Sequence, residues 1–319
     1  MSRRLRAVHV GLDVARDELV GHVWPLKQEF VFPNTAAGCR ALVSALKRLR
    51  PQRIVLEPTG GYERAALAAL RAAGFAVYLV NPQKVRAFAE STRGLAKTDR
   101  LDAAALAHYA AIWQPPAPIP RDPTAERLAE HLAWRDHLVS ERNRLANHAS
   151  HLRDPDLRRR SRAALVRLDA AIALATTELR RIVLGNERLA QLWRRLRTAP
   201  GIGELSAFAL IARLPELGQL DGKRIASLVG VAPHPWDSGR LKGRRIIQGG
   251  RFRLRRCLYM AILAATRKDG SLRNFFLTLQ RRGKPAKVAL MAALRKLLCR
   301  LNAMIRHNRD WRDQLATAA

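Results

Sequence analysis

The chain has 319 residues, of which 58 are Lys or Arg and 26 are Asp or Glu, so its net charge is +32. That length is enough for two domains, and positive charge spread along the whole chain favours a polyanion such as nucleic acid over a membrane surface as partner. The three cysteines are scattered without a CxxC pair, which argues against a disulfide framework and a zinc cage. No segment predicts a signal peptide or a membrane span, so we expect a cytoplasmic protein.

The first part of the chain predicts an α/β domain. Apolar runs, helical periodicity and breaker residues give the expected elements in chain order: strands at Leu5–Val14, Leu19–Trp24 and Glu29–Pro33, a helix capped by Asn34 and running to about Leu49, a strand at Arg53–Leu56, a helix at Tyr62–Ala73, a strand at Ala76–Val80, and helices at Gln83–Glu90 and Asp99–Trp113. This order predicts a mixed sheet flanked by helices, and it matches a ribonuclease-H-like sheet.

The second part of the chain predicts helices throughout. Five prolines over 114–123 indicate a semi-rigid linker, so the expected domains are 1–114 and, beyond a linker at 115–123, a helical connector at 124–186 and a C-terminal domain at 187–319. Leucine, isoleucine and alanine residues spaced by three and four between 165 and 182 form a heptad seam in the connector. The seam fits an intramolecular helical hairpin and a dimer contact equally well.

Four carboxylates stand out in the first part because the rest of the chain is so basic. Asp13 and Glu57 follow two apolar runs that could be neighbouring strands, and Asp99 and Asp102 are spaced i, i+3 on one helix face. Converging carboxylates are what a Mg²⁺ site for phosphodiester chemistry needs. The alternative is that Asp99 caps its helix, Asp13 belongs to a turn and Glu57 is solvated.

Two segments of the second part fit contacts with DNA phosphates. Gly201 and Gly203 lie in a Pro-Gly-Ile-Gly turn between helices, which resembles a helix-hairpin-helix element, the alternative being a plain helix–helix turn. Residues 230–251 have no regular pattern and are rich in glycine and arginine, so we expect a phosphate-binding loop that also contains Ser238. Its candidate phosphate-binding residues are Arg240, Lys242, Arg244, Arg245 and Arg251.

Taken together, six segments resemble the DEDD-type transposases of bacterial insertion sequences, the family numbered one hundred and ten, whose relatives include pilin-gene invertases. The matching segments are GLDVA at 11–15, LEPTGGYE at 56–63, VNPQKVRAFA at 80–89, GLAKTDRLDAAALA at 94–107, APGIG at 199–203, and LVGVAP, SG, GGR, LR and LYMA between 228 and 261. The resemblance covers nearly the whole chain in the same order, although the connector matches only by pattern.

The resemblance implies a RuvC-like N-terminal domain, a coiled-coil connector and a C-terminal transposase domain with an essential serine. It implies that Asp13, Glu57, Asp99 and Asp102 hold Mg²⁺, with Mn²⁺ as a substitute. It further implies that Ser238 attacks a DNA phosphate to form a phosphoserine intermediate, which a DNA hydroxyl later displaces.

The same resemblance implies the partners of the chain. These are double-stranded donor and target DNA, a structured guide RNA encoded beside the gene, and further copies of the chain in dimers and tetramers. We therefore expect a bacterial protein that joins the nucleoid during its reaction.

Two other functions remain open on the residues alone. A RuvC-like structure-selective nuclease would use the acidic set with metal-activated water and need no serine. A non-catalytic nucleic-acid-binding scaffold would use only the hairpin and the basic loop. The Ser238 segment and the long connector argue against the nuclease, and the four carboxylates argue against the scaffold.

Overall fold

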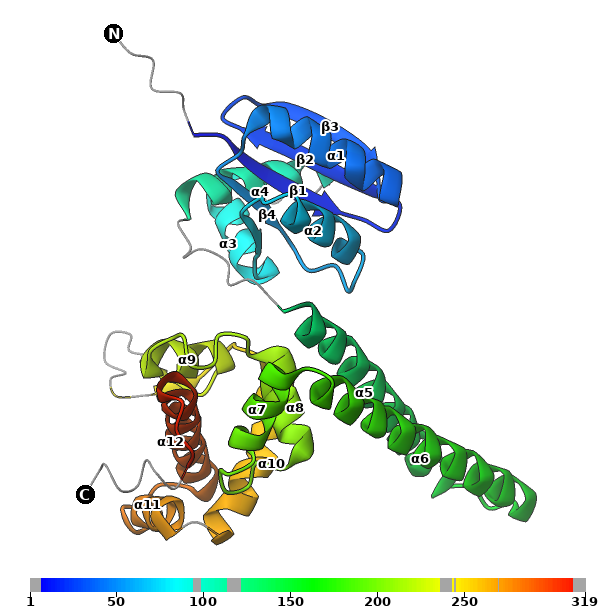
Figure 1. Cartoon of the computed structure of the whole chain (residues 1–319), viewed down its shortest axis with the longest axis vertical. Helices are drawn as coiled ribbons and strands as arrows, with labels where there is room; N and C mark the ends of the chain where they lie inside the picture. The colour runs from blue at the N-terminus through cyan, green and yellow to red at the C-terminus, as the bar shows by residue number, and fades with distance from the viewer. Residues whose placement is uncertain are drawn as a thin grey trace. The chain divides into compact units, whose positions relative to one another are not determined.

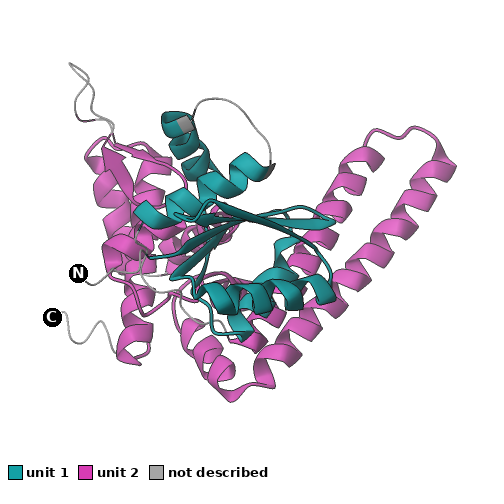
Figure 2. Ribbon diagram, turned by 90° about the horizontal axis from the view of Figure 1, so that it is seen from above, with its two compact units in different colours: residues 1–118 teal, residues 119–319 magenta. Residues whose placement is uncertain are grey.

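The structure is a computed structural model that describes residues 7–93, 99–113, 122–235, 243, 245–268 and 270–311. It contains two compact units, unit 1 over residues 1–118 and unit 2 over residues 119–319 (Figure 2). The first is an α/β unit and the second is mainly helical, which confirms the predicted fold class at this level. Within the described residues, no helix combines the length and the apolar character that crossing a membrane requires.

Unit 1 is built on a mixed five-stranded sheet in the order β3-β2-β1-β4-β5 (Figure 1). Its elements are β1 His9–Val14, β2 Glu18–Trp24, β3 Gln28–Pro33, α1 Ala36–Leu49, β4 Arg53–Leu56, α2 Glu63–Ala72, β5 Val77–Leu79, α3 Pro82–Arg93 and α4 Asp99–Ile112. The first three strands form an antiparallel meander, whereas β1, β4 and β5 run parallel. The predicted strands and helices of this unit are all present, with ends shifted by a few residues.

Helices cover both faces of the sheet. Alternate residues of β1, starting with Val10 and Leu12, pack with α1 and α2 in one apolar cluster. On the opposite face, Val55 of β4 packs with α3 and α4, where Leu106 is fully buried. Because side chains alternate along a strand, His9, Gly11 and Asp13 belong to the α4 face.

Unit 2 is a helical unit with one long hairpin (Figure 1). Its elements are α5 Pro123–Ala149, α6 Pro155–Leu184, α7 Glu187–Leu196, α8 Glu204–Arg213, α9 Gly222–Val229, β6 Pro233–Pro235, β7 Arg245–Ile247, α10 Phe252–Lys268, α11 Gly270–Arg281 and α12 Ala286–His307. The hairpin of α5 and α6 is held along its length by pairs such as Arg142–Asp169 at 3.0 Å. The near end of the hairpin joins the main core, because Leu128 and Leu179 are fully buried there.

The heptad seam packs within the chain. Along α6 the seam residues from Leu165 to Ala175 are half-buried, and those nearer the core, Leu179 and Ile182, are buried. Arg135 Nε of α5 donates to Thr176 Oγ1 of α6 at 2.8 Å. Two apolar side chains of the hairpin, Val166 and Leu174, remain 67% and 72% exposed. The hairpin therefore accounts for the seam without a second chain, and it leaves another apolar surface uncovered.

Two local expectations were wrong. Thr35, not Asn34, caps α1, because the Thr35 side chain accepts the Gly38 N–H. The segment between α9 and α10 is not wholly irregular, since β6 and β7 pair antiparallel within it. The β6 sequence, Pro-His-Pro, has no apolar alternation that would predict a strand.

Candidate functional site

Two of the predicted carboxylates lie at the same edge of the unit 1 sheet. β1 and β4 are parallel neighbours in which Leu12 pairs with Leu56, so Asp13 and Glu57 follow one step later at equal register. Both residues are half-buried. The carboxyl ends of neighbouring parallel strands are where α/β sheets commonly place functional groups.

Helix α4 runs antiparallel to β1 across this face of the sheet. At its far end, the His108 ring stacks on Trp24 at 4.4 Å, and Arg53 donates to the Ala110 carbonyl at 3.1 Å. Trp24 and Arg53 both pair with His9 at the start of β1. The first turn of α4 therefore lies toward the opposite end of β1, the end that carries Asp13.

A glycine sets how closely α4 approaches the sheet. A Cβ on Gly11 would lie 2.1 Å from the Ala103 carbonyl oxygen and 2.3 Å from the Ala107 nitrogen. Both distances are far below van der Waals contact, so only glycine fits at this position. The close approach brings Asp102, which directly precedes Ala103, down to the end of the sheet that carries Asp13 and Glu57.

The structure thus brings Asp13, Glu57 and the first turn of α4 to one edge of the sheet. Asp102 is half-buried in the first turn of α4, and Asp99 is the first residue of that helix. Within the side chains that the structure describes, no three His, Cys, Asp or Glu residues group tightly enough to hold a metal ion. The Asp99 side chain lies outside that description. Carboxylate oxygens are the ligands that hard divalent cations prefer.

Glu63 organises the loop after β4, a role that sequence reasoning missed. It is only 8% exposed, and its Oε2 accepts the Thr59 N–H at 3.1 Å, the Thr59 hydroxyl at 3.0 Å and the Gly61 N–H at 2.8 Å. Burial raises the pKa of this carboxyl, but hydrogen bonds from the backbone of Glu63, Gly61 and Thr59 and from the Thr59 hydroxyl outweigh it, so the pKa lies below its usual value. Glu63 is therefore a buried carboxylate that fixes the loop starting at Glu57.

Asn34 ties the two strand ends together. Its side-chain nitrogen donates to the Ala15 carbonyl at 2.9 Å and to the Tyr62 carbonyl at 3.1 Å. Ala15 directly follows β1, whereas Tyr62 ends the loop after β4. One amide thus holds together the segments that carry Asp13 and Glu57. An asparagine just before a helix predicts a cap, which is why sequence reasoning assigned it the wrong role.

Most of the predicted basic loop, including Ser238, Arg240, Lys242 and Arg244, lies outside the described residues. Arg245 begins β7 and is exposed. Arg251 is held inside the unit, because its guanidinium contacts the Glu216 carboxylate at 2.5 and 2.6 Å and donates to the Arg213 carbonyl at 2.7 Å. These contacts give Arg251 a structural role that its place in the loop did not predict.

The two glycines of the α7–α8 turn differ. Gly201 has a φ of +77°, and a Cβ there would lie 2.1 Å from the Ala261 carbonyl oxygen of α10. Gly201 therefore serves packing against α10. Gly203 is exposed and precedes α8 with no atom within 4 Å of an added Cβ. The Glu204 carboxylate of α8 contacts Arg180 at 2.7 Å.

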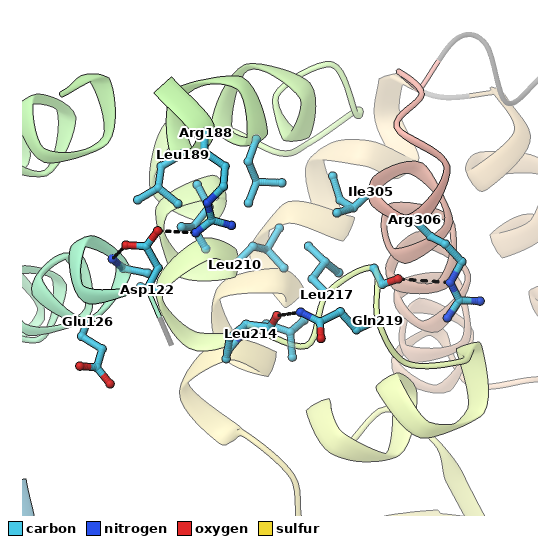
Figure 3. Close-up of a pocket in the computed structure, with 16 residues that line it drawn as sticks. Asp122, Glu126, Arg188, Leu189, Leu210, Leu214, Leu217, Gln219, Ile305 and Arg306 are labelled. Atoms are coloured by element: carbon cyan, nitrogen blue, oxygen red, sulfur yellow. Dashed lines mark hydrogen bonds and ion pairs between the residues drawn. The ribbon is translucent and has the colours of Figure 1, made fainter. Parts of the chain in front are cut away.

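A cavity of about 350 Å³ in unit 2 is not part of this acidic site (Figure 3). Its walls are leucine and isoleucine side chains from α7, α8 and α12, and Asp122 and Arg188 form an ion pair of 2.5 Å at its rim. Glu126 also lines it. Two acidic and two basic residues line the cavity, Asp122 and Glu126 with Arg188 and Arg306, so it lacks the excess of positive charge that a nucleic acid requires.

Comparison with protein families matches two separate parts of the chain. Residues 10–153 match a DEDD-type family model described as a transposase, and residues 193–277 match the transposase IS116/IS110/IS902 family. The first match contains all four acidic residues, and the second contains Ser238.

Individual proteins are also similar to this chain over nearly its whole length. A pilin gene-inverting protein of Moraxella bovis is 28% identical over 95% of this chain and 97% of its own length. An uncharacterized 44.8 kDa protein of insertion element IS116 from Streptomyces clavuligerus is 26% identical over 97% of each chain. The Thermus thermophilus RuvC structure matches 33% of this chain and 96% of its own, at 18% identity. Its TM-score of 0.26 leaves the RuvC-like assignment of unit 1 a prediction.

Proposed function

Because this chain belongs to the IS116/IS110/IS902 family of transposases, we propose that it cuts and rejoins DNA through a covalent intermediate on Ser238. The family and the pilin gene-inverting relatives make it a DNA transposase or recombinase. One observation carries the proposal: the two family matches contain, respectively, the complete acidic set and the serine.

The reaction proposed for Ser238 forms one bond to phosphorus for each such bond that it breaks. The Ser238 oxygen loses its proton and forms a bond to a DNA phosphorus, while the bond from that phosphorus to a deoxyribose oxygen breaks and the released hydroxyl takes up a proton. A hydroxyl of another DNA strand then attacks the phosphoserine, which restores the serine and joins the strands. The bond energy of the cut strand is thereby kept for rejoining.

The acidic set would hold a divalent cation, which we propose is Mg²⁺ with Mn²⁺ as a substitute. Asp13, Glu57, Asp99 and Asp102 are its ligand candidates, supported by the shared edge of β1, β4 and α4. Such an ion supplies Lewis acidity at a phosphate. Glu63 and Asn34 fix the strand ends that carry two of these ligands.

The partners of the reaction are DNA, a structured guide RNA and further copies of the chain. The net charge of +32 supports binding to both nucleic acids. Val166 and Leu174, exposed on the α5–α6 hairpin, support contact between connectors in a dimer that assembles to a tetramer. Gly203 and the basic residues from Arg240 to Arg245 are the proposed phosphate contacts of unit 2.

The test is covalent trapping of DNA on the protein. Cells carrying the gene with its flanking DNA and a target plasmid are lysed under denaturing conditions, and DNA attached to the protein is measured. We expect an adduct on the wild type and none on Ser238→Ala or Asp102→Asn. Matched controls are Ser227→Ala, an exposed serine of α9, and Asp17→Asn, whose side chain is 92% exposed.

The opposite result would point to a different chemistry. If junction DNA is cut by Ser238→Ala as well as by the wild type, and no adduct forms, the chain is a RuvC-like nuclease that uses activated water. Loss of activity in Ser227→Ala or Asp17→Asn would mean that the variants report on folding rather than on the site.

A further inference from the structure

Unit 2 contains a second hollow with a chemistry unlike that of the cavity in Figure 3. It is an open groove of about 1140 Å³ between β6, β7, α10, α11 and α12. Of the site residues predicted from the sequence, Arg245 lines this groove. Its lining separates into an apolar surface and a set of cations.

The apolar surface of the groove is unusually accessible. Phe252 is 61% exposed and Val288 is 52% exposed, and Tyr259, Phe275 and Met291 complete the surface between them. Large apolar side chains gathered in one exposed hollow mark a binding site rather than a core. Three of the five are aromatic, which adds flat faces on which a planar ligand can stack.

Cations surround this surface. The basic residues that line the groove are Arg245, Arg255, Arg256, Lys287, Arg295 and Lys296. Two of them lie over aromatic faces, Arg255 at 5.6 Å from the Phe252 ring centroid and Lys296 at 4.5 Å from that of Phe275. Among the described residues that line the groove none is acidic, in contrast to the cavity with Asp122 and Glu126 at its rim. The groove therefore suits a ligand that is both flat and polyanionic.

We propose that this groove binds an unpaired DNA strand, with bases against the aromatic surface and phosphates against the cations. In a duplex the base faces are covered by stacking, so a duplex could use the cations but not Phe252, Tyr259 or Phe275. Stacking platforms flanked by basic residues are the common solution for single strands. Charge complementarity disfavours a basic or an uncharged apolar partner in a groove lined by so many cations.

The position of the groove in the chain gives this strand a role. β6 and β7, which line it, are the elements on either side of Ser238 in the sequence. If Ser238 acts as proposed above, the groove holds the DNA strand unpaired beside the phosphate that Ser238 attacks. The groove is thus the proposed binding site for single-stranded DNA during strand exchange.

The test uses the full chain and a single-stranded oligodeoxynucleotide of about 15 nucleotides, a length that spans one such site. The strand carries 5-bromodeoxyuridine for photo-cross-linking, and excess duplex DNA occupies the remaining basic surface. We expect cross-links to peptides from 252–259 and 288–299. An RNA of the same sequence is the second arm, and it should compete less well than the DNA.

Matched variants on α10 make the test specific. Phe252→Ala should weaken binding of the single strand by about tenfold and leave duplex binding unchanged. Met260→Ala, equally exposed at 65% but outside the groove, should change neither. Likewise Arg256→Ala should weaken the single strand more than Arg253→Ala, an exposed arginine of the same helix outside the groove.

Several results would overturn the inference. They are cross-links elsewhere, equal losses in Phe252→Ala and Met260→Ala, preference for the RNA, or a changed oligomeric state of Phe252→Ala, which would make the groove an interface between copies. Binding of a single strand in the groove needs no catalysis by Ser238, so the groove and the serine reaction can be tested separately. Adducts that depend on Ser238, without cross-links in the groove, would contradict only the proposal for the groove. Cross-links in the groove without adducts would contradict only the proposed serine reaction.

Discussion

At the scale of single residues, Glu63 is a buried carboxylate that holds the loop beginning at Glu57 without being a candidate ligand itself. Its carboxylate accepts three hydrogen bonds from the loop that begins at Glu57, and it is only 8% exposed. We expect Glu63→Gln to lower the free energy of unfolding by about 1–3 kcal/mol at neutral pH, because charge-assisted hydrogen bonds are lost. Chemical unfolding followed by circular dichroism measures this difference. The exposed Glu90→Gln is the control and should change nothing.

The same residue predicts a pH dependence. The pKa of Glu63 is lowered on folding, so its stabilising contribution is complete above the unfolded value of about 4.5 and disappears as pH falls through the folded pKa. The difference between wild type and Glu63→Gln should therefore be constant from pH 6 to 8 and shrink in acid. A difference that grows as pH falls would contradict the assigned hydrogen bonds. Recombination at neutral pH should fall in the variant, as Glu57 loses its support.

At the scale of elements, contact between β1 and α4 decides whether the acidic residues share an edge. Gly11→Ala places a methyl group 2.1 Å from the Ala103 carbonyl, so α4 must move away from the sheet. We expect a loss of about 1–3 kcal/mol in unfolding free energy and a strong loss of adduct formation, measured together on one variant. Gly270→Ala, with no atom within 4 Å of the new Cβ, is the control and should retain both. Normal activity in Gly11→Ala would mean that the position of α4 is not critical.

Elements also show what could be predicted from the sequence. The strands and helices of unit 1 follow apolar runs and breakers, so Asp13, Glu57 and the helix with Asp102 could be placed from the amino-acid pattern alone. Their convergence could not, because it depends on the parallel pairing of β1 with β4 and on the close approach at Gly11. Glu63 was missed because a glutamate in the first turn of a helix ordinarily indicates only a favourable helix end. The groove was missed because its lining depends on how five successive elements, β6, β7, α10, α11 and α12, pack together, which the amino-acid pattern does not give.

At the scale of the whole molecule, positive charge is divided unequally between the two units. Residues 1–114 carry 17 basic and 9 acidic residues, whereas residues 115–319 carry 41 and 17, giving net charges of +8 and +24. A unit that must bind a cation through carboxylates cannot also carry the densest positive charge without weakening that binding. The division is therefore consistent with the metal site proposed in unit 1 and the phosphate contacts proposed in unit 2.

This division predicts how binding of duplex DNA responds to salt. Each phosphate contact steepens the fall of log K with log salt concentration by about 0.9, because a counterion is released from the DNA. Replacing Arg240, Lys242 and Arg244 together with alanine should therefore lower the slope by roughly two to three, measured by fluorescence anisotropy over a salt series. The matched triple at the C-terminal end of α1, with Lys47, Arg48 and the following Arg50 replaced, removes the same charge from unit 1 and should leave the slope nearly unchanged. Equal effects of the two triples would mean that DNA is bound by the net charge of the whole molecule rather than by the segment that carries Ser238.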